Sequence, residues 1–404
     1  MKILFLTQWF DPEPTPKGLL FAKKLCQHGH TVEVLTAIPN YPHGKYYPGY
    51  RFRLFQQEMI DGVRVIRVPI YPSHDKSALK RIFTYLSFSF FAMVYGLFAT
   101  KKADLIYAYH PPNVGFVAAL LSLIKQIPFV HDIQDLWPDS FVSTGMIKNK
   151  FILTIINIFC RWVYKRASVL IVISPGFKRE LIARKVPQEK IKVIYNWCDE
   201  AKITKPRDIL ENPMADNGKF NILFAGNMGK AQNLSLVIDA AKILMDKRPE
   251  IQFNFVGAGL ELEFLKKYTS SSQISNVEFI PRLPMDQIGA LLTSANVLLV
   301  HLKPDPLFEI TIPSKIQAYL AIGKPVLISV GGDAANIIKE AEAGLVAVPG
   351  NVGSLVEACE SFLDMEQNRL LEMGLNGKHY YYNHFSLDVG VRNIEKIFKK
   401  VISA

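Results

Sequence analysis

Short apolar runs alternate with longer amphipathic segments along the whole chain. Apolar runs bounded by turn residues predict buried strands, and apolar residues at every third or fourth position predict helices. This alternation is typical of α/β domains whose helices connect parallel strands. One set of runs lies at residues 3–6, 32–35, 105–109, 129–130 and 169–173. A second set lies at residues 221–226, 253–257, 277–280, 297–300, 326–328 and 345–348.

The two sets of runs predict two domains. A chain of 404 residues is too long for one compact core and suits two domains of about 200 residues. Residues 198–219 are polar and have no clear period, so we place the linker there. We expect an α/β fold of two Rossmann-like domains, at 1–200 and 201–380, whose parallel sheets face a central cleft. We expect residues 381–404 to form a C-terminal helix that packs back on the first domain.

One segment of the first domain is unusually apolar. Residues 82–100 carry no charge and are flanked by Lys80 and Arg81 on one side and by Lys101 and Lys102 on the other. The length is sufficient to span a bilayer, but equal basic flanks encode no orientation. Three alternatives stay open: a spanning helix, a helix buried in the domain, and an interfacial helix with basic flanks on anionic headgroups. Residues 151–166 show the same combination of apolar and basic residues.

The net positive charge lies entirely in the first half of the chain. Residues 1–200 contain 26 Lys and Arg against 14 Asp and Glu, whereas residues 201–404 contain 21 against 22. A basic half suggests a phosphate-bearing partner, either anionic lipid or nucleic acid. The chain has no Lys/Arg-rich arm, zinc-finger spacing or aromatic RNA-binding motif, so we expect an anionic membrane surface and no nucleic acid.

The cysteines and the N-terminus bear on location. The four cysteines have neither the pairing order of a disulfide framework nor metal-ligand spacing, which favours a reducing compartment. The first seven residues read as a strand rather than as a signal peptide. We therefore expect a cytoplasmic protein without a structural metal.

The segment Pro313-Ser314-Lys315 has the signals of a helix start, and Gly323 has those of a helix end. The first N–H groups of a helix lack internal partners, and the helix dipole adds positive potential. A serine and a lysine at this position suit a phosphate. An ordinary solvated cap is the alternative.

Two glycine-containing turns follow strands of the second set. The turn after residue 225 contains Gly226, where backbone amides can approach a phosphate, and Lys230, which would neutralise a leaving diphosphate. The second turn contains Gly257, but position 262 is leucine, so the dinucleotide fingerprint is absent. A tight turn without a ligand explains Gly257 equally well.

Polar residues also follow the strands of the first set. They are Lys17, Gly18, His110, His131, Asp132, Asp135 and Trp137. A single histidine after a strand is more often structural, but two histidines and two aspartates at one sheet edge favour a polar pocket. Asp132 and Asp135 do not have Asp-X-Asp spacing, so we expect no catalytic metal and no cofactor.

Several segments in this order resemble a known family. They are residues 9–13 with Gly18, 29–36, 135–138, 191–196, 226–232 and 313–315. The chain resembles the retaining glycosyltransferases of family 4, which have the two-lobed GT-B fold. Within them it is similar to bacterial surface-polysaccharide enzymes of the WbuB (fucosaminyltransferase) type. The resemblance covers essentially the whole length.

The resemblance implies a reaction. A sugar, plausibly a deoxy or amino sugar such as N-acetyl-L-fucosamine, passes from a nucleoside diphosphate, UDP, to a lipid-linked (polyprenyl diphosphate) saccharide. The product would belong to O-antigen, capsule or exopolysaccharide biosynthesis, and the enzyme would be peripheral on the inner face of the plasma membrane. No protein nucleophile or metal is implied, because the enzyme's task is to stabilise the departing diphosphate.

The resemblance also assigns residues. His131 and Lys230 are the candidate catalytic residues. The candidate donor-binding residues are Gly226, Asn227, Gln232, Asn233, Gly257, Arg282, Glu309, Pro313, Ser314, Lys315 and Gln317. The candidate acceptor-binding residues are Lys17, Gly18, His110, Asp132, Asp135 and Trp137.

The chain departs from the family at four of its sites. Asn227 and Gln232 replace the family's Arg and Lys after the first glycine, and Ile310 and Ala318 occupy the positions of its two Glu. Either Glu309 and Gln317, one position earlier, take over the grip on the donor, or Ser314 and Lys315 make it. Two other functions remain: a sugar-nucleotide 2-epimerase of the same fold, and a non-catalytic subunit that binds a sugar nucleotide or a membrane.

Overall fold

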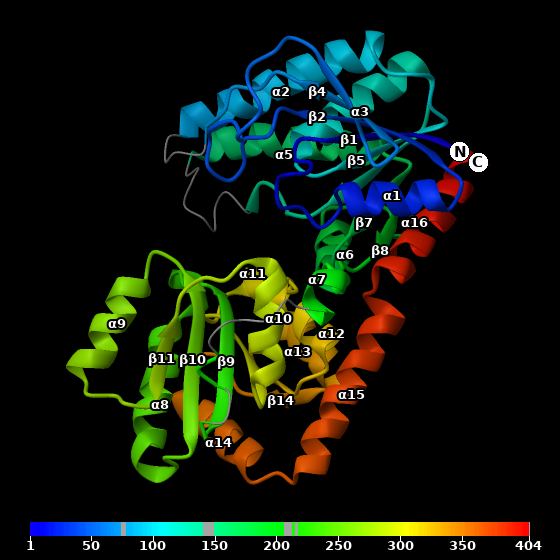
Figure 1. The fold of residues 1–404 in the computed structure, drawn as a ribbon. Coiled ribbons are helices and arrows are strands. Elements are labelled where there is room, and N and C mark those ends of the chain that lie inside the picture. The colour runs from blue at the N-terminus through cyan, green and yellow to red at the C-terminus, as the bar shows by residue number, and fades with distance from the viewer. Residues whose placement is uncertain (74–77, 140–148, 206–211, 215–216, 404) are drawn as a thin grey trace. The chain divides into compact units, whose positions relative to one another are not determined.

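The structure is a computed structural model that describes residues 1–73, 78–139, 149–205, 212–214 and 217–403. The chain forms two compact units (Figure 1). The first contains Met1–Tyr195 and the C-terminal residues from Gly390 onward, and the second contains Asn196–Val389. Each unit has its own sheet with helices packed on it, so the predicted α/β fold with two Rossmann-like domains is confirmed.

The first unit has an eight-stranded sheet in the order β3-β4-β2-β1-β5-β6-β7-β8. The strands are β1 (Lys2–Thr7), β2 (Thr31–Ala37), β3 (Gln56–Ile60), β4 (Val63–Val68), β5 (Leu105–Tyr109), β6 (Phe129–Ile133), β7 (Val169–Val172) and β8 (Ile191–Val193). All neighbours are parallel except β3 and β4, which form an antiparallel hairpin at one edge. The five predicted runs are β1, β2, β5, β6 and β7. Strands β3, β4 and β8 were not predicted: β3 is polar and pairs with β4, and β8 has three residues.

Helices cover both faces of the first sheet. They are α1 (Leu19–Gln27), α2 (Ala78–Phe98), α3 (Pro112–Lys125), α5 (Lys150–Arg166), α6 (Pro175–Ala183), the short η1 (Gln188–Lys190) and most of α16 (Leu387–Ile402). In Figure 1, α2, α3 and α5 lie on one face of the sheet, and α1 and α16 lie on the other. The ring of Tyr107 on β5 packs against Phe398 of α16 at 5.4 Å. Glu395 of the same helix accepts hydrogen bonds from His28 at 3.0 Å and His30 at 2.7 Å.

Helix α2 contains the apolar segment singled out in the sequence. Among the described residues it is the one helix long and apolar enough, over Lys80–Phe98, to cross a membrane by length and composition. Only 22 % of that stretch is buried. Thr84, Phe88 and Ala92 recur every fourth residue and face inward, whereas Leu86 and Phe90 are exposed. The helix is therefore covered on one face rather than enclosed on all sides.

The second unit has a six-stranded, fully parallel sheet in the order β11-β10-β9-β12-β13-β14. The strands are β9 (Phe220–Asn227), β10 (Ile251–Ala258), β11 (Val277–Ile280), β12 (Val297–His301), β13 (Val326–Ser329) and β14 (Gly344–Val346). All six predicted runs are strands, because a parallel strand buried on both faces reads as a continuous apolar run.

The helices of the second unit include the one predicted after Ser314. They are α7 (Glu200–Thr204), η2 (Lys230–Gln232), α8 (Leu234–Lys247), α9 (Leu262–Ser271), α10 (Met285–Ser294), α11 (Pro306–Glu309), α12 (Lys315–Ile322), α13 (Gly332–Glu340), α14 (Val352–Leu363) and α15 (Gln367–His384). Helix α12 begins after Ser314 and ends before Gly323, whose φ of 81° is the left-handed cap expected of glycine. Both predicted limits of this helix are confirmed.

The segments that connect the units differ from the expectation in detail. The division lies after Tyr195, slightly before residue 200, and α7 occupies part of the expected linker. Residues 206–211 and 215–216 of that linker lie outside the described residues. The expected start of the C-terminal helix at residue 381 is wrong: α15 ends at His384 and α16 starts at Leu387. The expected packing of this helix on the first domain is found for the residues from Gly390 onward. Ser386 lies at the break, and its hydroxyl accepts the Val389 N–H of the new helix at 3.4 Å.

Candidate functional site

Lys315 is the most unusual polar residue of the second unit. Part of the residue is exposed, but its Nζ atom is buried, 3.5 Å from the centroid of the Phe224 ring. Within the described chain, Nζ has no hydrogen-bond partner. Burial lowers the pKa of Lys315 to about 7. A buried amine without an acceptor is costly, and an anion beside it would remove that cost.

Two glycines shape the space around Lys315 at the end of β9. Gly226 has a φ of 144°, and a Cβ there would lie 3.4 Å from Nζ of Lys315. Gly257 is its register partner on β10, and a Cβ on Gly257 would lie 1.9 Å from the Gly226 oxygen. Close packing of two strand ends therefore explains Gly257, while Gly226 keeps the surroundings of Lys315 open. The Tyr319 hydroxyl accepts the Ala225 N–H at 2.9 Å and ties α12 to β9.

The sequence analysis missed His301 and Ser329, which end β12 and β13 as register partners. The Nδ1 atom of His301 is 2.7 Å from the Gln232 oxygen, to which it donates. Its Nε2 and the Ser329 hydroxyl are buried and have no partner among the described residues. Burial lowers the pKa of His301 against the opposing effect of the Gln232 carbonyl, and the charge of Lys315 lowers it further. Each of the two is a polar residue at the end of an apolar run, and this was the signal by which the sequence could have identified them.

In the turn after Gly226, the predicted residues Gln232 and Lys230 have different environments. The Gln232 side chain accepts the Gly229 N–H at 3.0 Å and is engaged within the turn, and Asn233 has a φ of 49°. Lys230 is exposed, and the described residues give it no ion pair. Lys230 is therefore the charged side chain of this turn that is exposed to a ligand.

The two candidates for the missing glutamate pair differ in placement. Gln317 is buried, and with its amide O and N exchanged, the orientation that satisfies both atoms, the amide donates to the Pro313 and Ser314 oxygens at 3.1 and 2.6 Å. It therefore holds the first turn of α12. Glu309 is exposed, and its backbone oxygen is so close to Gly332 that a Cβ there would lie 1.9 Å away. This contact places Glu309 beside the start of α13.

The remaining donor-side candidates are exposed or partly exposed. Ser314 and Asn227 are exposed, and Pro313 is half-buried. Arg282 is exposed after the edge strand β11, which β10 separates from β9. Arg282 is therefore the candidate farthest from Lys315 across the sheet order.

In the first unit, Lys17 and Asp132 bind each other. Their side chains are fully buried, and Nζ of Lys17 lies 2.5 Å from Oδ2 of Asp132. Tyr107 donates its hydroxyl to the same oxygen at 2.6 Å. Burial lowers the pKa of Lys17, although the Asp132 carboxylate acts in the opposite direction. The pair forms an internal polar cluster, so its acceptor-binding role stays a prediction.

Gly18 lies in the loop that leads into α1. A Cβ there would lie 2.1 Å from Oδ2 of Asp11, and that oxygen accepts the Leu19 N–H at 2.6 Å. A side chain at position 18 would displace the carboxylate that caps the start of the helix. Packing therefore accounts for this glycine in the structure.

His131 lies in the middle of the same polar region but faces away from Asp132. Its side chain is 1 % exposed, and its ring lies against Gly115 of α3, where a Cβ would be 2.5 Å from it. Burial lowers the pKa of His131 to about 3, with a smaller contribution from His110. The imidazole is therefore neutral, and its catalytic role stays a prediction.

A small pocket, here called the edge pocket, opens where β1 ends. It has a volume of about 80 Å³ and is lined by Gln8, Trp9, Asn40, Tyr41, Ser73, Arg81, Thr84 and Tyr85. The ring of Trp9 lies 4.9 Å from Tyr41 and 5.4 Å from His110. Flat aromatic rings beside amide groups and a guanidinium are the groups that bind sugars and phosphates.

Three predicted residues surround this pocket. His110 contacts Asp135 at 3.2 Å, and Trp137 packs against Tyr85 at 5.5 Å. The structure thus brings His110, Asp135 and Trp137 together, as expected. Tyr41 and Arg81 were missed because one lies in a loop and the other at the start of a helix. The described residues contain no cluster of His, Cys, Asp and Glu that could hold a metal ion.

Comparison with known proteins identifies the two units. The family model described as a glycosyl transferase 4-like domain matches residues 19–197, and that of glycosyl transferases group 1 matches residues 207–380. The chain belongs to the two-domain glycosyltransferases. This glycosyltransferase is 29 % identical over 349 residues to the putative colanic acid biosynthesis glycosyl transferase WcaI of Escherichia coli (strain K12). The match covers 81 % of this chain and 83 % of the relative.

Solved structures show the same fold. The Anabaena protein HepE, in complex with UDP, has a TM-score of 0.69 at 17 % identity, covering 99 % of this chain and 100 % of its own. WaaG, a glycosyltransferase involved in lipopolysaccharide biosynthesis, has a TM-score of 0.63 at 16 % identity, covering 98 % and 99 %. At these identities the likeness concerns the fold, and it confirms the GT-B prediction for this glycosyltransferase.

Proposed function

We propose that the protein is a retaining, metal-independent glycosyltransferase that transfers a sugar from UDP to a lipid-linked saccharide. The observation that carries the proposal is the buried Nζ atom of Lys315, which has no partner among the described residues and faces the space left by Gly226. The donor sugar would be a deoxy or amino sugar, as in the WbuB type. The relative WcaI is named a putative colanic acid biosynthesis enzyme; of the proteins with the same fold, WaaG is involved in lipopolysaccharide biosynthesis and HepE forms a complex with UDP.

In this reaction the second unit would stabilise the negative charge of the leaving diphosphate. Lys315 would meet its charge from the buried side and Lys230 from the exposed turn, with Nε2 of His301 as a further polar contact. The acceptor hydroxyl would attack from the face that the diphosphate leaves, so no protein nucleophile is needed. Fixed charges aimed at a developing anion are the largest catalytic contribution available to such a site.

The surface of the first unit suits an anionic membrane. Helices α2, α3 and α5 expose Ile82, Phe83, Leu86, Phe90, Val94, Phe98, Leu123, Ile124, Phe151, Ile152, Ile155 and Ile158. Lys80, Arg81, Lys101, Lys102 and Lys150 lie at the ends of α2 and α5. Apolar side chains with basic residues at their margins are typical of proteins that bind the inner face of the plasma membrane peripherally.

Turnover of sugar nucleotides tests the proposal. We expect UDP to be released from a UDP-sugar only when a polyprenyl-diphosphate-linked saccharide is added, with retention at the anomeric carbon and equal rates in EDTA. Isomerisation without an acceptor would identify an epimerase instead. Binding of sugar nucleotides without turnover under any acceptor would indicate a non-catalytic subunit.

Removal of the exposed lysine of the turn should slow this reaction. We expect Lys230→Ala to lower turnover about tenfold, because one charge facing the diphosphate is lost. Lys247→Ala is the matched control, since Lys247 is an exposed lysine at the far end of the following helix, α8. Equal kinetics for both variants and the unmodified protein would remove Lys230 from the site.

A further inference from the structure

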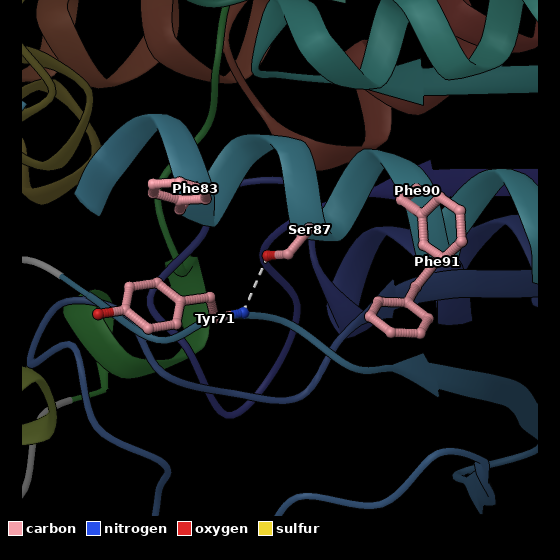
Figure 2. A pocket seen from close by; sticks show the side chains of 5 residues that line it. All are labelled: Tyr71, Phe83, Ser87, Phe90 and Phe91. Carbon is pink, nitrogen blue, oxygen red and sulfur yellow. Dashed lines mark hydrogen bonds between the residues drawn. The ribbon is translucent and has the colours of Figure 1, made fainter. Parts of the chain in front are cut away.

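A groove between α2 and the segment that follows β4 remains unexplained by the sugar-transfer site. It has a volume of about 550 Å³ and is lined by Tyr71, Phe83, Ser87, Phe90 and Phe91. Figure 2 shows Tyr71, on the segment that follows β4, beside α2, with Phe90 and Phe91 farther along the helix. This volume is within the range of sites that bind small molecules.

The Ser87 hydroxyl and the Tyr71 backbone N–H, two polar groups of the groove, are already engaged. The Ser87 hydroxyl accepts the Tyr71 N–H at 2.9 Å, drawn as a dashed line in Figure 2, and donates to the Thr84 oxygen at 3.1 Å. The remaining wall consists of aromatic rings, of which Phe83 is 61 % and Phe90 is 63 % exposed. Grouped, exposed aromatic rings around a hollow mark a binding surface, and the matching ligand is hydrocarbon.

The groove adjoins the edge pocket through α2 itself. Arg81, Thr84 and Tyr85 line the edge pocket, and Phe83 and Ser87, from the same turns of the helix, line the groove. The edge pocket is lined by the Arg81 guanidinium and by Ser73, and the Ser73 hydroxyl is buried and has no partner among the described residues. A cationic polar pocket next to an apolar groove is complementary to a molecule with an anionic head and a hydrocarbon chain.

We propose that the groove binds the first part of the hydrocarbon chain of the acceptor lipid, with its phosphate-bearing head beside Arg81 in the edge pocket. This inference rests on the proposed function, in which the acceptor is lipid-linked. A bilayer surface would be met by outward side chains such as Leu86 and Phe98, which do not line the groove. The concave groove takes a single chain and directs its head to the edge of the sheet where β1 ends.

Binding of a short isoprenoid phosphate tests the groove without any sugar. The full-length protein is titrated with farnesyl phosphate, farnesol or inorganic phosphate, below micelle concentrations and without vesicles. The fluorescence of Trp9, in the edge pocket, reports on binding together with calorimetry. We expect farnesyl phosphate to bind about tenfold more tightly than either fragment, because only it fills the groove and the edge pocket together.

Two pairs of substitutions on α2 separate the groove from general membrane affinity. Phe83→Ser with Phe90→Ser removes two walls of the groove, whereas Leu86→Ser with Phe98→Ser removes two exposed side chains outside it. We expect the first pair alone to lower affinity for farnesyl phosphate about tenfold, and both pairs to weaken binding to phosphatidylglycerol vesicles. All four side chains are exposed, so neither pair should unfold the protein, which circular dichroism checks.

Two outcomes overturn the inference. In the first, the Phe83→Ser, Phe90→Ser variant binds farnesyl phosphate as tightly as the unmodified protein. In the second, the Leu86→Ser, Phe98→Ser variant loses as much affinity for farnesyl phosphate as the groove variant. Titration with UDP distinguishes this failure from failure of the proposed function. Normal UDP binding without groove-dependent binding of farnesyl phosphate would refute the groove alone. Groove-dependent binding in a protein that transfers no sugar to any lipid acceptor would support the groove and refute the proposed function.

Discussion

Replacement of Lys315 by methionine is expected to lower the affinity for UDP about 100-fold, because a buried charge facing the diphosphate is lost. Turnover should fall by a similar factor, since the same charge stabilises the leaving group. Methionine fills nearly the same volume and removes a buried amine that has no partner in the described chain. The thermal stability of the variant should therefore be unchanged or higher, which separates the loss of binding from unfolding.

The pH dependence of UDP binding gives a second measurement on Lys315. Burial lowers its pKa from 10.5 to about 7, so the folded protein binds fewer protons at this residue than the unfolded chain between pH 7 and 10.5. The contribution of Lys315 to stability therefore rises with pH across this window. A diphosphate prefers the protonated amine, so affinity for UDP should fall above pH 7, by up to about tenfold per pH unit, with proton uptake on binding.

Calorimetry in buffers of different ionisation enthalpy measures this proton uptake. Lys324→Met is the matched control, because Lys324 is a partly buried lysine at the opposite end of α12. It should leave both the affinity for UDP and the proton uptake unchanged. Normal UDP affinity in the Lys315→Met variant would place the diphosphate elsewhere.

Replacement of Lys17 by methionine is expected to destabilise the first unit by about 3–5 kcal/mol, because it leaves the Asp132 carboxylate buried without its cation. Adding Asp132→Asn should restore most of this free energy of unfolding, since a neutral amide can still accept the Tyr107 hydroxyl. Three of the four tryptophans belong to the first unit, so intrinsic fluorescence during urea unfolding follows mainly this unit.

An exposed ion pair on the same unit provides the comparison. Lys23 binds Asp61 at 2.7 Å, with side chains 37 % and 55 % exposed, and Lys23→Met should cost less than about 1 kcal/mol. If Lys17→Met were no more destabilising than Lys23→Met, the buried pair would not stabilise the unit. Failure of Asp132→Asn to rescue the variant would show that Lys17 acts through packing rather than through charge.

The sequence predicted the second sheet better than the first for a physical reason. Strands β9 to β14 are parallel, and most are buried on both faces, so each is an apolar run. Strand β3 lies at a sheet edge and consists largely of polar residues. It pairs with β4 in a hairpin, and no apolar run in the sequence marks this strand. Local propensity is a weak guide where only one face of a strand is covered.

The candidate sites divide in the same way. The order of strands was enough to place His110, Asp135 and Trp137 near one another. It could not show that Lys17 and Asp132 satisfy each other inside the unit, because burial of a side chain depends on packing from both faces of the sheet. His301 was missed for the same reason: its importance lies in a nitrogen left without a partner among the described residues, which no pattern of residues reveals.

The pairing of α16 with the first unit bears on how the protein is made. Strand β5 and helix α1 are synthesised early, but Phe398, which covers Tyr107, and Glu395, which binds His28 and His30, follow the second unit in the chain. One face of the first unit's sheet therefore lacks its α16 contacts while the whole second unit is translated. A nascent chain halted at Tyr195 would expose the Tyr107 face of its sheet to chaperones, and that face is covered only once α16 has been synthesised.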